Sequence, residues 1–171
     1  MNINLAINKA SKILRNKFIS NSQLDSEILM AKTINKDRNY ILFNSEALMS
    51  KNDLDRFYRL IHLRSLGNPV AYLTNKKHFW NSEFYVTRHT LIPRPDTELI
   101  IENVLKLTKQ KNKISILDIG VGSGCILLSI LKERENFYGT GIDVSEKCLN
   151  VSKINAISLN VNNRLKLFKS N

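Results

Sequence analysis

The last third of the chain alternates regularly between extended and helical patterns. Residues 114–119 form a short apolar run with strand character, and the glycine-rich stretch GVGSG follows it. A helical pattern over about 124–134, an extended run over about 137–143, a helical pattern over about 145–157 and a final extended run, RLKLFKS, come next. This order of strand, helix, strand, helix, strand predicts a parallel sheet joined by crossover helices, which is an α/β fold.

The first 66 residues have a different pattern, typical of a small helical bundle. Apolar residues recur at helical spacing from Ile3 to Leu14, and the polar cluster SNS then offers an N-cap for a second helix. A short helix is expected around residues 38–43. Ser50 with Asp53 marks the start of a further helix, which the stretch GNP should end.

Between these parts, residues 67–92 are rich in aromatic and β-branched residues, with Asn81 and Ser82 between two extended runs. This composition predicts a β-hairpin linker. After PRPDTE, a helix is expected, with Leu99, Ile100, Val104 and Leu107 on one face. We therefore expect three parts, at 1–66, 67–92 and 93–171.

Composition excludes several classes of protein. With 171 residues and 43% hydrophobic residues, the chain is long enough to bury a core. No apolar run approaches the roughly 18 residues that span a bilayer, and the N-terminus lacks the apolar core of a signal peptide, so we expect a cytoplasmic protein without a membrane partner. The two cysteines and three histidines are scattered, which suggests neither a disulfide framework nor a metal site. The net charge of +11 would permit binding to phosphate-rich partners such as nucleic acid or ribosomes, but it is spread along the chain without a basic block. A solvated surface rich in Lys and Asn is the alternative, and we expect no direct nucleic-acid binding.

The glycine loop predicts a ligand site. A strand that enters a helix through a glycine-rich turn brings backbone N–H groups and the positive helix end to one place, which suits an acceptor or an anion. Gly120, Gly122 and Gly124 form a GxGxG pattern, with Val121 and Ser123 between them. Cys125 stands where a dinucleotide fingerprint has Gly or Ala, and the absence of GKS or GKT excludes a P-loop.

Asp143 is the predicted partner of this loop. It ends the second strand, where a carboxylate accepts hydrogen bonds from both hydroxyls of an adenosine ribose. The pattern fits S-adenosylmethionine better than a dinucleotide, although a nicotinamide or flavin nucleotide and a purely structural turn stay as alternatives. Asp118 either faces the methionine end of such a cofactor or only accepts hydrogen bonds from loop amides.

Several stretches together resemble one family, the HemK-like release factor glutamine methyltransferases. They are GNPVAYLTNKKHFW, FYVTRHTLIPRPDTELIIE, ILDIGVGSGCILLSILKE and GIDVSEKCLNVSKINA. The resemblance implies S-adenosylmethionine as cofactor and a peptide-chain release factor as partner, gripped by the helical bundle. It also implies that Gly120 to Gly124 wrap the cofactor's methionine part, that Asp143 binds its ribose, and that Arg94, Pro95 and Thr97 lie beside the mouth of the active site. An architectural role for that last segment, as a helix start, is the alternative.

The family's catalytic Asn-Pro-Pro-Tyr motif occurs nowhere in this sequence. Its Asn and a backbone carbonyl aim the substrate amide, so no catalytic residue is assigned here. The resemblance further implies a truncated Rossmann-like methyltransferase domain, with strands 3, 2 and 1 of a seven-stranded sheet, and a missing C-terminal half. The chain is therefore expected to be an N-terminal fragment that is inactive alone. The alternatives are a non-catalytic remnant or release-factor interaction module, and a fragment of a nucleic-acid adenine methyltransferase.

Overall fold

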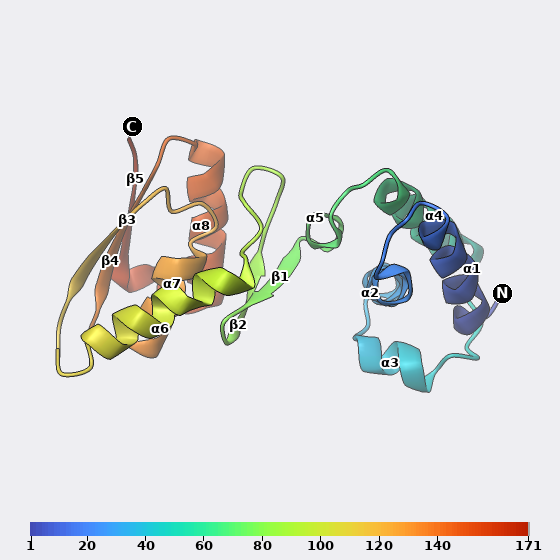
Figure 1. The fold of residues 1–171 in the computed structure, drawn as a ribbon, viewed down its shortest axis with the longest axis horizontal. Coiled ribbons are helices and arrows are strands. Elements are labelled where there is room, and N and C mark those ends of the chain that lie inside the picture. Colours follow the sequence, from blue (N-terminus) through green and yellow to red (C-terminus); the bar gives the residue numbers. More distant parts are fainter. Residues whose placement is uncertain (171) are drawn as a thin grey trace. The chain divides into compact units, whose positions relative to one another are not determined.

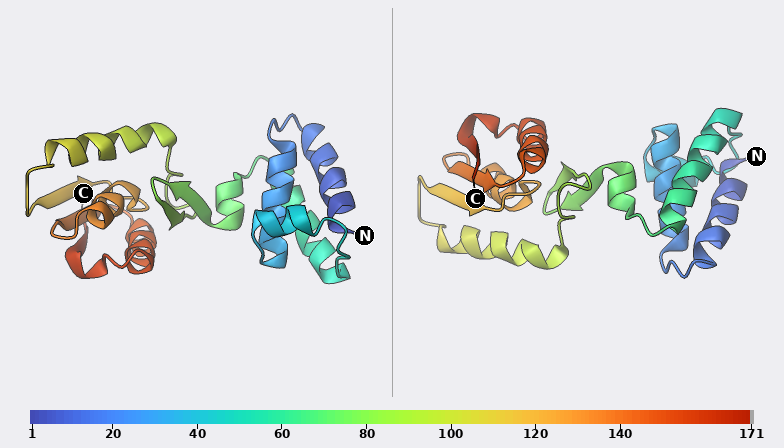
Figure 2. Two further views of the ribbon diagram at one scale, coloured as in Figure 1. Left: turned by 90° about the horizontal axis from the view of Figure 1, so that it is seen from below. Right: turned by 90° about the horizontal axis from the view of Figure 1, so that it is seen from above.

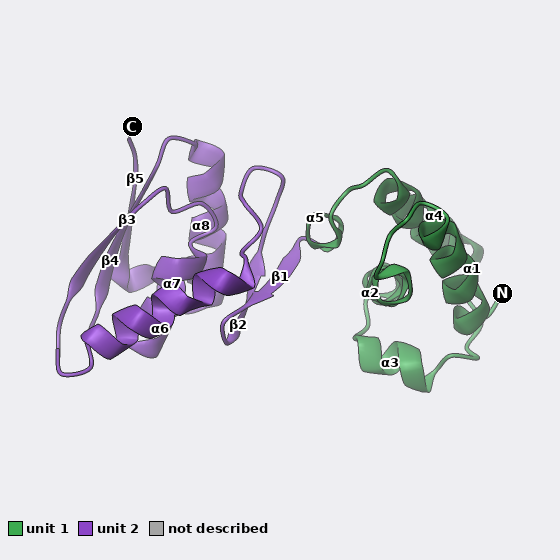
Figure 3. Ribbon diagram, in the orientation of Figure 1, with its two compact units in different colours: residues 1–74 green, residues 75–171 purple. Residues whose placement is uncertain are grey.

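The chain, examined as a computed structural model that describes residues 1–170, folds into two compact units. These units are residues 1–74 and 75–171 (Figure 3). The first unit is helical, and the second holds all the strands that the structure describes.

Unit 1 is a bundle in which α1, α2 and α4 pack side by side (Figures 1 and 2). Its helices are α1 (Ile3–Arg15), α2 (Ser22–Ile34), α3 (Arg38–Phe43), α4 (Lys51–Ser65) and α5 (Val70–Thr74). The buried faces of the first four helices build one core around Leu14, Leu29, Ile41 and Phe57, each at most 2% exposed. The bundle predicted for this region is confirmed.

Local sequence sets where these helices begin. The side chains of Asn2, Asp37 and Ser50 accept hydrogen bonds from backbone N–H groups in the first turns of α1, α3 and α4. Such N-caps satisfy donors that a helix start otherwise leaves free. Between helices, Arg64 of α4 donates through Nε to Asp25 of α2 at 2.7 Å, which joins two helices far apart in sequence.

The predicted hairpin begins later than the sequence suggested. Residues 70–74 form helix α5, because the carbonyl of Pro69 accepts hydrogen bonds from the N–H groups of Tyr72 and Leu73 and starts a helical turn. Val70 and Leu73 also pack against the core of unit 1. Tertiary packing therefore overrides the β-branched and aromatic composition that favoured an extended run here.

The hairpin itself is present as β1 (Lys76–Phe79) and β2 (Ser82–Tyr85), paired antiparallel. Phe79 pairs with Ser82, so Trp80 and Asn81 make the turn. The 3-10 turn η1 (Pro95–Thr97) leads into α6 (Glu98–Leu107). The predicted helix is present, but Leu99, Ile100 and Leu107 of its apolar face are exposed, and the fully buried residue is Ile101.

The second half of unit 2 is a three-stranded parallel sheet in the order β3-β4-β5, as the alternation predicted. Its elements are β3 (Ser115–Ile119), α7 (Cys125–Glu133), β4 (Tyr138–Asp143), α8 (Glu146–Ser158), η2 (Asn162–Arg164) and β5 (Leu165–Lys169). Helices α6, α7 and α8 lie on one side of this sheet (Figure 1). A Cβ on Gly139 would lie 2.9 Å from a methyl carbon of Leu127, so the glycine lets α7 pack close.

The opposite face of the sheet is apolar and exposed within residues 1–170. Leu117, Ile119 and Phe168 are 57%, 77% and 53% exposed, and the register places all three on this face. In the part of the chain that the structure describes, β3 pairs only with β4, so its other edge is open. None of the described helices is both long and apolar enough to cross a membrane.

Candidate functional site

The glycine loop connects the end of β3 to the start of α7. Gly120, Gly122 and Gly124 have φ of +85°, +56° and +80°, a region that side-chain-bearing residues rarely adopt. At Gly124 there is also no room for a side chain, because a Cβ would lie 2.7 Å from Leu128 Cδ1 and 3.2 Å from Ser152 Oγ. The backbone conformation therefore requires glycine at all three positions, and close packing requires it at Gly124 as well.

Hydrogen bonds hold the loop against its neighbours. The N–H groups of Gly120 and Val121 both donate to the carbonyl of Ile142 on β4, at 2.8 and 3.0 Å. The N–H of Gly124 donates to the carbonyl of Val121 at 2.8 Å. Within residues 1–170, the N–H of Ser123 has no hydrogen-bond partner, and the residue as a whole is 4% exposed.

Asp143, at the end of β4, lies directly beside the loop as predicted. Its carboxylate accepts the N–H of Gly122 at 3.0 Å and the N–H of Ser145 at 2.9 Å. An ionised carboxylate has about four acceptor positions, so roughly two stay available for hydroxyl groups. The structure thus brings Asp143 and the glycine loop into one half-buried site.

Asp118 lies one residue before the end of β3, close enough to Asp143 for their charges to interact. Burial is the main cause that raises the pKa of Asp118; the nearby charge of Asp143 raises it further, and a hydrogen bond from the N–H of Leu127 opposes them. Burial likewise raises the pKa of the Cys125 thiol at the start of α7, so the thiol is kept protonated. Asp118 and Asp143 thus lie near each other at the loop, and a positively charged ligand would favour ionisation of Asp118.

Comparison with known proteins finds similar sequences over nearly the whole chain. A sequence profile described as the PrmC N-terminal domain matches residues 6–74. The chain is 39% identical over its whole length to a release factor glutamine methyltransferase of Buchnera aphidicola from Schizaphis graminum, of which it covers 61%. It is 35% identical to the protein of that name from Clostridium acetobutylicum, with 98% of this chain and 59% of that protein aligned. The chain is thus similar over nearly its whole length to release factor glutamine methyltransferases, and residues 6–74 match the PrmC N-terminal domain.

The match covers only part of those family members, since the chain spans about three fifths of their length. Among solved structures, a SAM-dependent methyltransferase from Geobacter sulfurreducens in complex with S-adenosyl-L-homocysteine aligns with 48% of this chain and 31% of its own, at 26% identity and a TM-score of 0.39. The YjhP protein of E. coli aligns with 45% of this chain and 31% of its own, at 31% identity and the same TM-score. Scores at this level describe a partial likeness and carry no functional conclusion.

The segment with Arg94, Pro95 and Thr97 forms no hydrogen bond with the glycine loop within the described residues. Arg94 and Pro95 are exposed, Thr97 is half-buried, and the N–H of Thr97 donates to the carbonyl of Arg94. Within the described residues, no hydrogen bond or ion pair joins these three to the glycine loop or to Asp143. Their substrate-side role stays a prediction, as does the cofactor role of the loop residues.

Two further residues contact the glycine loop and were not predicted from the sequence. Ser152 and Asn155 of α8 are both at most 1% exposed and hydrogen-bond to carbonyls of the glycine loop. The sequence signal was present, because both polar residues fall on the buried helix face that carries Val151 and Ala156. A buried polar residue on an apolar helix face normally has a specific hydrogen-bond partner.

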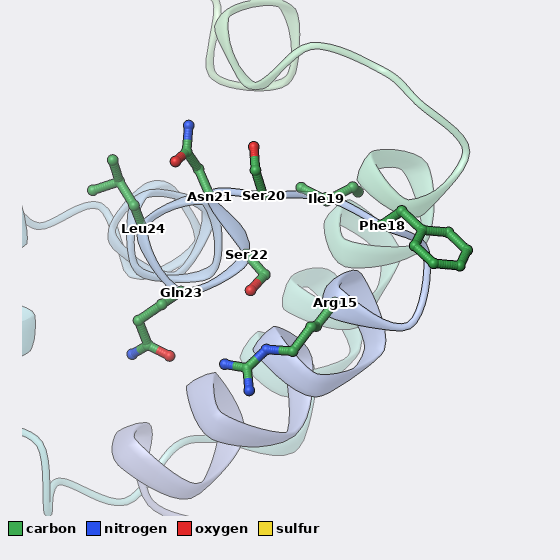
Figure 4. Close-up of a pocket in the computed structure, with 8 residues that line it drawn as sticks. All are labelled: Arg15, Phe18, Ile19, Ser20, Asn21, Ser22, Gln23 and Leu24. Atoms are coloured by element: carbon green, nitrogen blue, oxygen red, sulfur yellow. The ribbon is translucent and has the colours of Figure 1, made fainter.

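Unit 1 has a hollow of its own, of about 630 Å³, at the turn between α1 and α2 (Figure 4). Its lining contains none of the residues predicted for the site; these residues are Arg15, Phe18, Ile19, Ser20, Asn21, Ser22, Gln23 and Leu24. The Phe18 ring extends away from the bundle and is 98% exposed. No function is assigned to this hollow.

Proposed function

We propose that this chain supplies the S-adenosylmethionine-binding and substrate-recognition parts of an enzyme that methylates a glutamine side-chain amide in peptide-chain release factors. The observation that carries the proposal is the meeting of the glycine loop with Asp143 in a chain 39% identical to a release factor glutamine methyltransferase. The proposed setting is the cytoplasm, where release factors act.

The residues at the loop suit this cofactor. The free N–H of Ser123 offers a donor, and the unused acceptor positions of Asp143 suit the two hydroxyls of a ribose. Asp118 lies close to Asp143 beside the loop, where a positive charge on a ligand would favour ionisation of its carboxyl. S-adenosylmethionine, when bound, supplies a methyl group on a positively charged sulfonium. Gly120, Val121, Gly122, Ser123, Gly124 and Asp143 are thus the proposed cofactor-binding residues.

Substrate recognition is assigned to unit 1 and to the segment after the hairpin. The match of residues 6–74 to the PrmC N-terminal domain supports a role of the bundle in gripping the release factor. We assign Arg94, Pro95 and Thr97 to the substrate side of the site. The exposure of Arg94 and Pro95 leaves these two side chains accessible to a partner protein.

Methyl transfer itself is proposed to need residues that this chain does not contain. An amide nitrogen is a poor nucleophile, so catalysis depends on groups that position it, and the sequence has no Asn-Pro-Pro-Tyr motif to do so. The open β3 edge and the apolar face with Leu117 and Ile119 are the surfaces to which a polypeptide carrying such groups would add.

A reconstitution experiment tests whether methyl transfer needs residues that this chain does not contain. The chain is incubated with release factor and S-adenosylmethionine, alone or with a separately produced polypeptide that carries the uncovered part of the Buchnera relative. Mass spectrometry of the release-factor peptides should detect methylated glutamine only in the mixture. Methylation by the chain alone would contradict the proposed need for further residues.

A second candidate is an interaction module that binds release factor without a cofactor. The observation that favours it is that Asp143 already accepts two backbone N–H groups, so its role can be to fix the loop. Complex formation with release factor but no binding of S-adenosylmethionine would support this candidate. Nothing in the described structure favours a nucleic-acid adenine methyltransferase over these two.

A further inference from the structure

One buried side chain joins three parts of unit 2. Asn155 of α8 is 1% exposed, and its carboxamide oxygen accepts the N–H of Tyr85 on β2 at 2.7 Å. Its nitrogen donates to the carbonyl of Tyr85 at 2.9 Å and to the carbonyl of Ser123 in the glycine loop at 2.8 Å. Both amide protons and one oxygen acceptor position are therefore used, as expected for a fully buried amide.

A second side chain of α8 acts on the neighbouring peptide of the same loop. Ser152, which is fully buried one turn before Asn155, donates from Oγ to the carbonyl of Gly122 at 2.8 Å. Two consecutive loop carbonyls are thus turned toward α8. In a trans peptide the N–H points opposite to the C=O, so the free N–H of Ser123 is directed away from α8.

Glycine at position 124 allows the close contact between the loop and α8. A Cβ at this position would lie 3.2 Å from Ser152 Oγ, so the missing side chain is what lets α8 approach the loop closely. The loop's shape is consequently set from α8 as well as by its own glycines. Asn155 extends this contact to the hairpin, because Tyr85 is the last residue of β2.

We propose that Asn155 is a positioning residue that holds the glycine loop in its cofactor-binding shape and fixes it against the end of the hairpin. Ser152 assists by holding the preceding carbonyl. The inference rests on the proposed function in one respect, namely that the loop binds S-adenosylmethionine. The contacts themselves are independent of that function and are tested separately.

Substitutions of Asn155 can distinguish its contact with the hairpin from its contact with the glycine loop. Alanine removes the donor and the acceptor, which leaves the buried carbonyl of Ser123 and the partly buried N–H and carbonyl of Tyr85 without these partners. An ionised aspartate keeps an acceptor for the N–H of Tyr85 but donates neither to the carbonyl of Tyr85 nor to that of Ser123. The Asn155→Asp variant therefore keeps one of the two hydrogen bonds to the hairpin and loses the hydrogen bond to the loop.

The experiment uses the full chain, labelled with nitrogen-15, as wild type and as Asn155→Ala, Asn155→Asp, Ser152→Ala and Asn150→Ala. Asn150 is exposed on the same helix and serves as the matched control. Amide proton shifts are recorded without cofactor, and binding of S-adenosylhomocysteine is measured by calorimetry. Circular dichroism establishes that each variant is folded, and Ser152→Ala, which removes a single hydroxyl, is the milder variant if Asn155→Ala unfolds.

In the cofactor-free protein, Asn155→Ala should shift the amide protons of both Tyr85 and Gly124, since the Gly124 N–H shares a peptide with the Ser123 carbonyl. Asn155→Asp should leave the Tyr85 signal near its wild-type position and shift Gly124. Both variants should raise the dissociation constant of S-adenosylhomocysteine by about tenfold or more, and Ser152→Ala by a smaller factor. Asn150→Ala should match wild type in every respect.

Two results would overturn the inference. One is an unchanged Gly124 amide signal in folded Asn155→Ala protein, which would show that the side chain does not hold the loop. The other is a dissociation constant within about twofold of wild type for both Asn155 variants. If wild type itself does not bind S-adenosylhomocysteine, the proposed function fails, whereas the amide signals still decide whether Asn155 positions the loop.

Discussion

The glycines of the loop differ in why they are needed. Gly120 and Gly124 have similar positive φ values of +85° and +80°. A Cβ on Gly120 would meet nothing within 4 Å, whereas one on Gly124 would lie 2.7 Å from Leu128 Cδ1. The first position therefore demands only conformational freedom, and the second demands free space as well.

Alanine at these two positions separates the two demands. Gly120→Ala should lower the free energy of unfolding by about 1 kcal/mol through backbone strain alone. Gly124→Ala should lower it by about 2–4 kcal/mol, because overpacking against Leu128 and Ser152 adds to the strain. Urea unfolding of both variants provides the comparison. Equal losses would show that the Leu128 side chain moves aside without cost.

Asp118 gives the protein a pH dependence of known sign. Its pKa is raised in the folded state, chiefly by burial, so the folded protein holds this proton more tightly than the unfolded chain. Stability should therefore fall as pH rises from the ordinary aspartate range through the raised pKa. Asp118→Asn, which stays neutral, should be more stable than wild type at pH 7 and lose that advantage near pH 4. Thermal midpoints across this range would test it, and a constant difference would contradict it.

Among the helices and strands, sequence periodicity predicted those whose position depends on local sequence. The three strands and two crossover helices of the sheet follow the predicted order because their apolar runs and glycine loop are unambiguous. Helix α5 was missed because Val70 and Leu73 pack on unit 1, a tertiary contact that composition does not reveal. For α6, the helix itself was predicted, but its six apolar residues lie around more than one face, and packing selects Ile101 for burial.

In the candidate site, too, some residues could be predicted from local sequence and others depend on long-range contacts. The loop and Asp143 were predictable, since strand ends in a parallel sheet meet at one edge. Asn155 was not assigned, because its partners Tyr85 and Ser123 are 70 and 32 residues away in sequence. Long-range hydrogen bonds of one buried amide have no periodic signature. Only its place on an apolar helix face indicated that a partner must exist.

The link between α2 and α4 makes a prediction at this scale. Arg64 donates to Asp25 at 2.7 Å and to the carbonyl of Asn68 at 3.2 Å, with 20% of its side chain exposed. Arg64→Ala should lower the stability of unit 1 by about 2–3 kcal/mol, because Asp25 keeps a poorly solvated charge. Arg59→Ala, at an exposed position of the same helix, should cost under about 0.5 kcal/mol. Similar losses in urea unfolding would show that the pair contributes nothing.

At the scale of the whole molecule, the open sheet face affects behaviour in solution. Ile119 is 77% exposed beside Leu117 on this face, and the β3 edge is unpaired within residues 1–170. Apolar faces and free edges of this kind promote self-association. Ile119→Lys should reduce self-association in sedimentation experiments while changing the free energy of unfolding by less than about 0.5 kcal/mol. A large loss of stability would mean that the side chain is packed rather than exposed.

The central claim is that the glycine loop and Asp143 together bind S-adenosylmethionine. Calorimetric titration of the full chain with S-adenosylhomocysteine tests it most directly, with Asp143→Asn as the site variant and Glu135→Gln, an exposed acid of the same unit, as its control. Wild type and Glu135→Gln should bind, and Asp143→Asn should bind at least about tenfold more weakly. Folded wild-type protein that gives no heat at millimolar ligand, or an Asp143→Asn variant that binds like wild type, would contradict the claim.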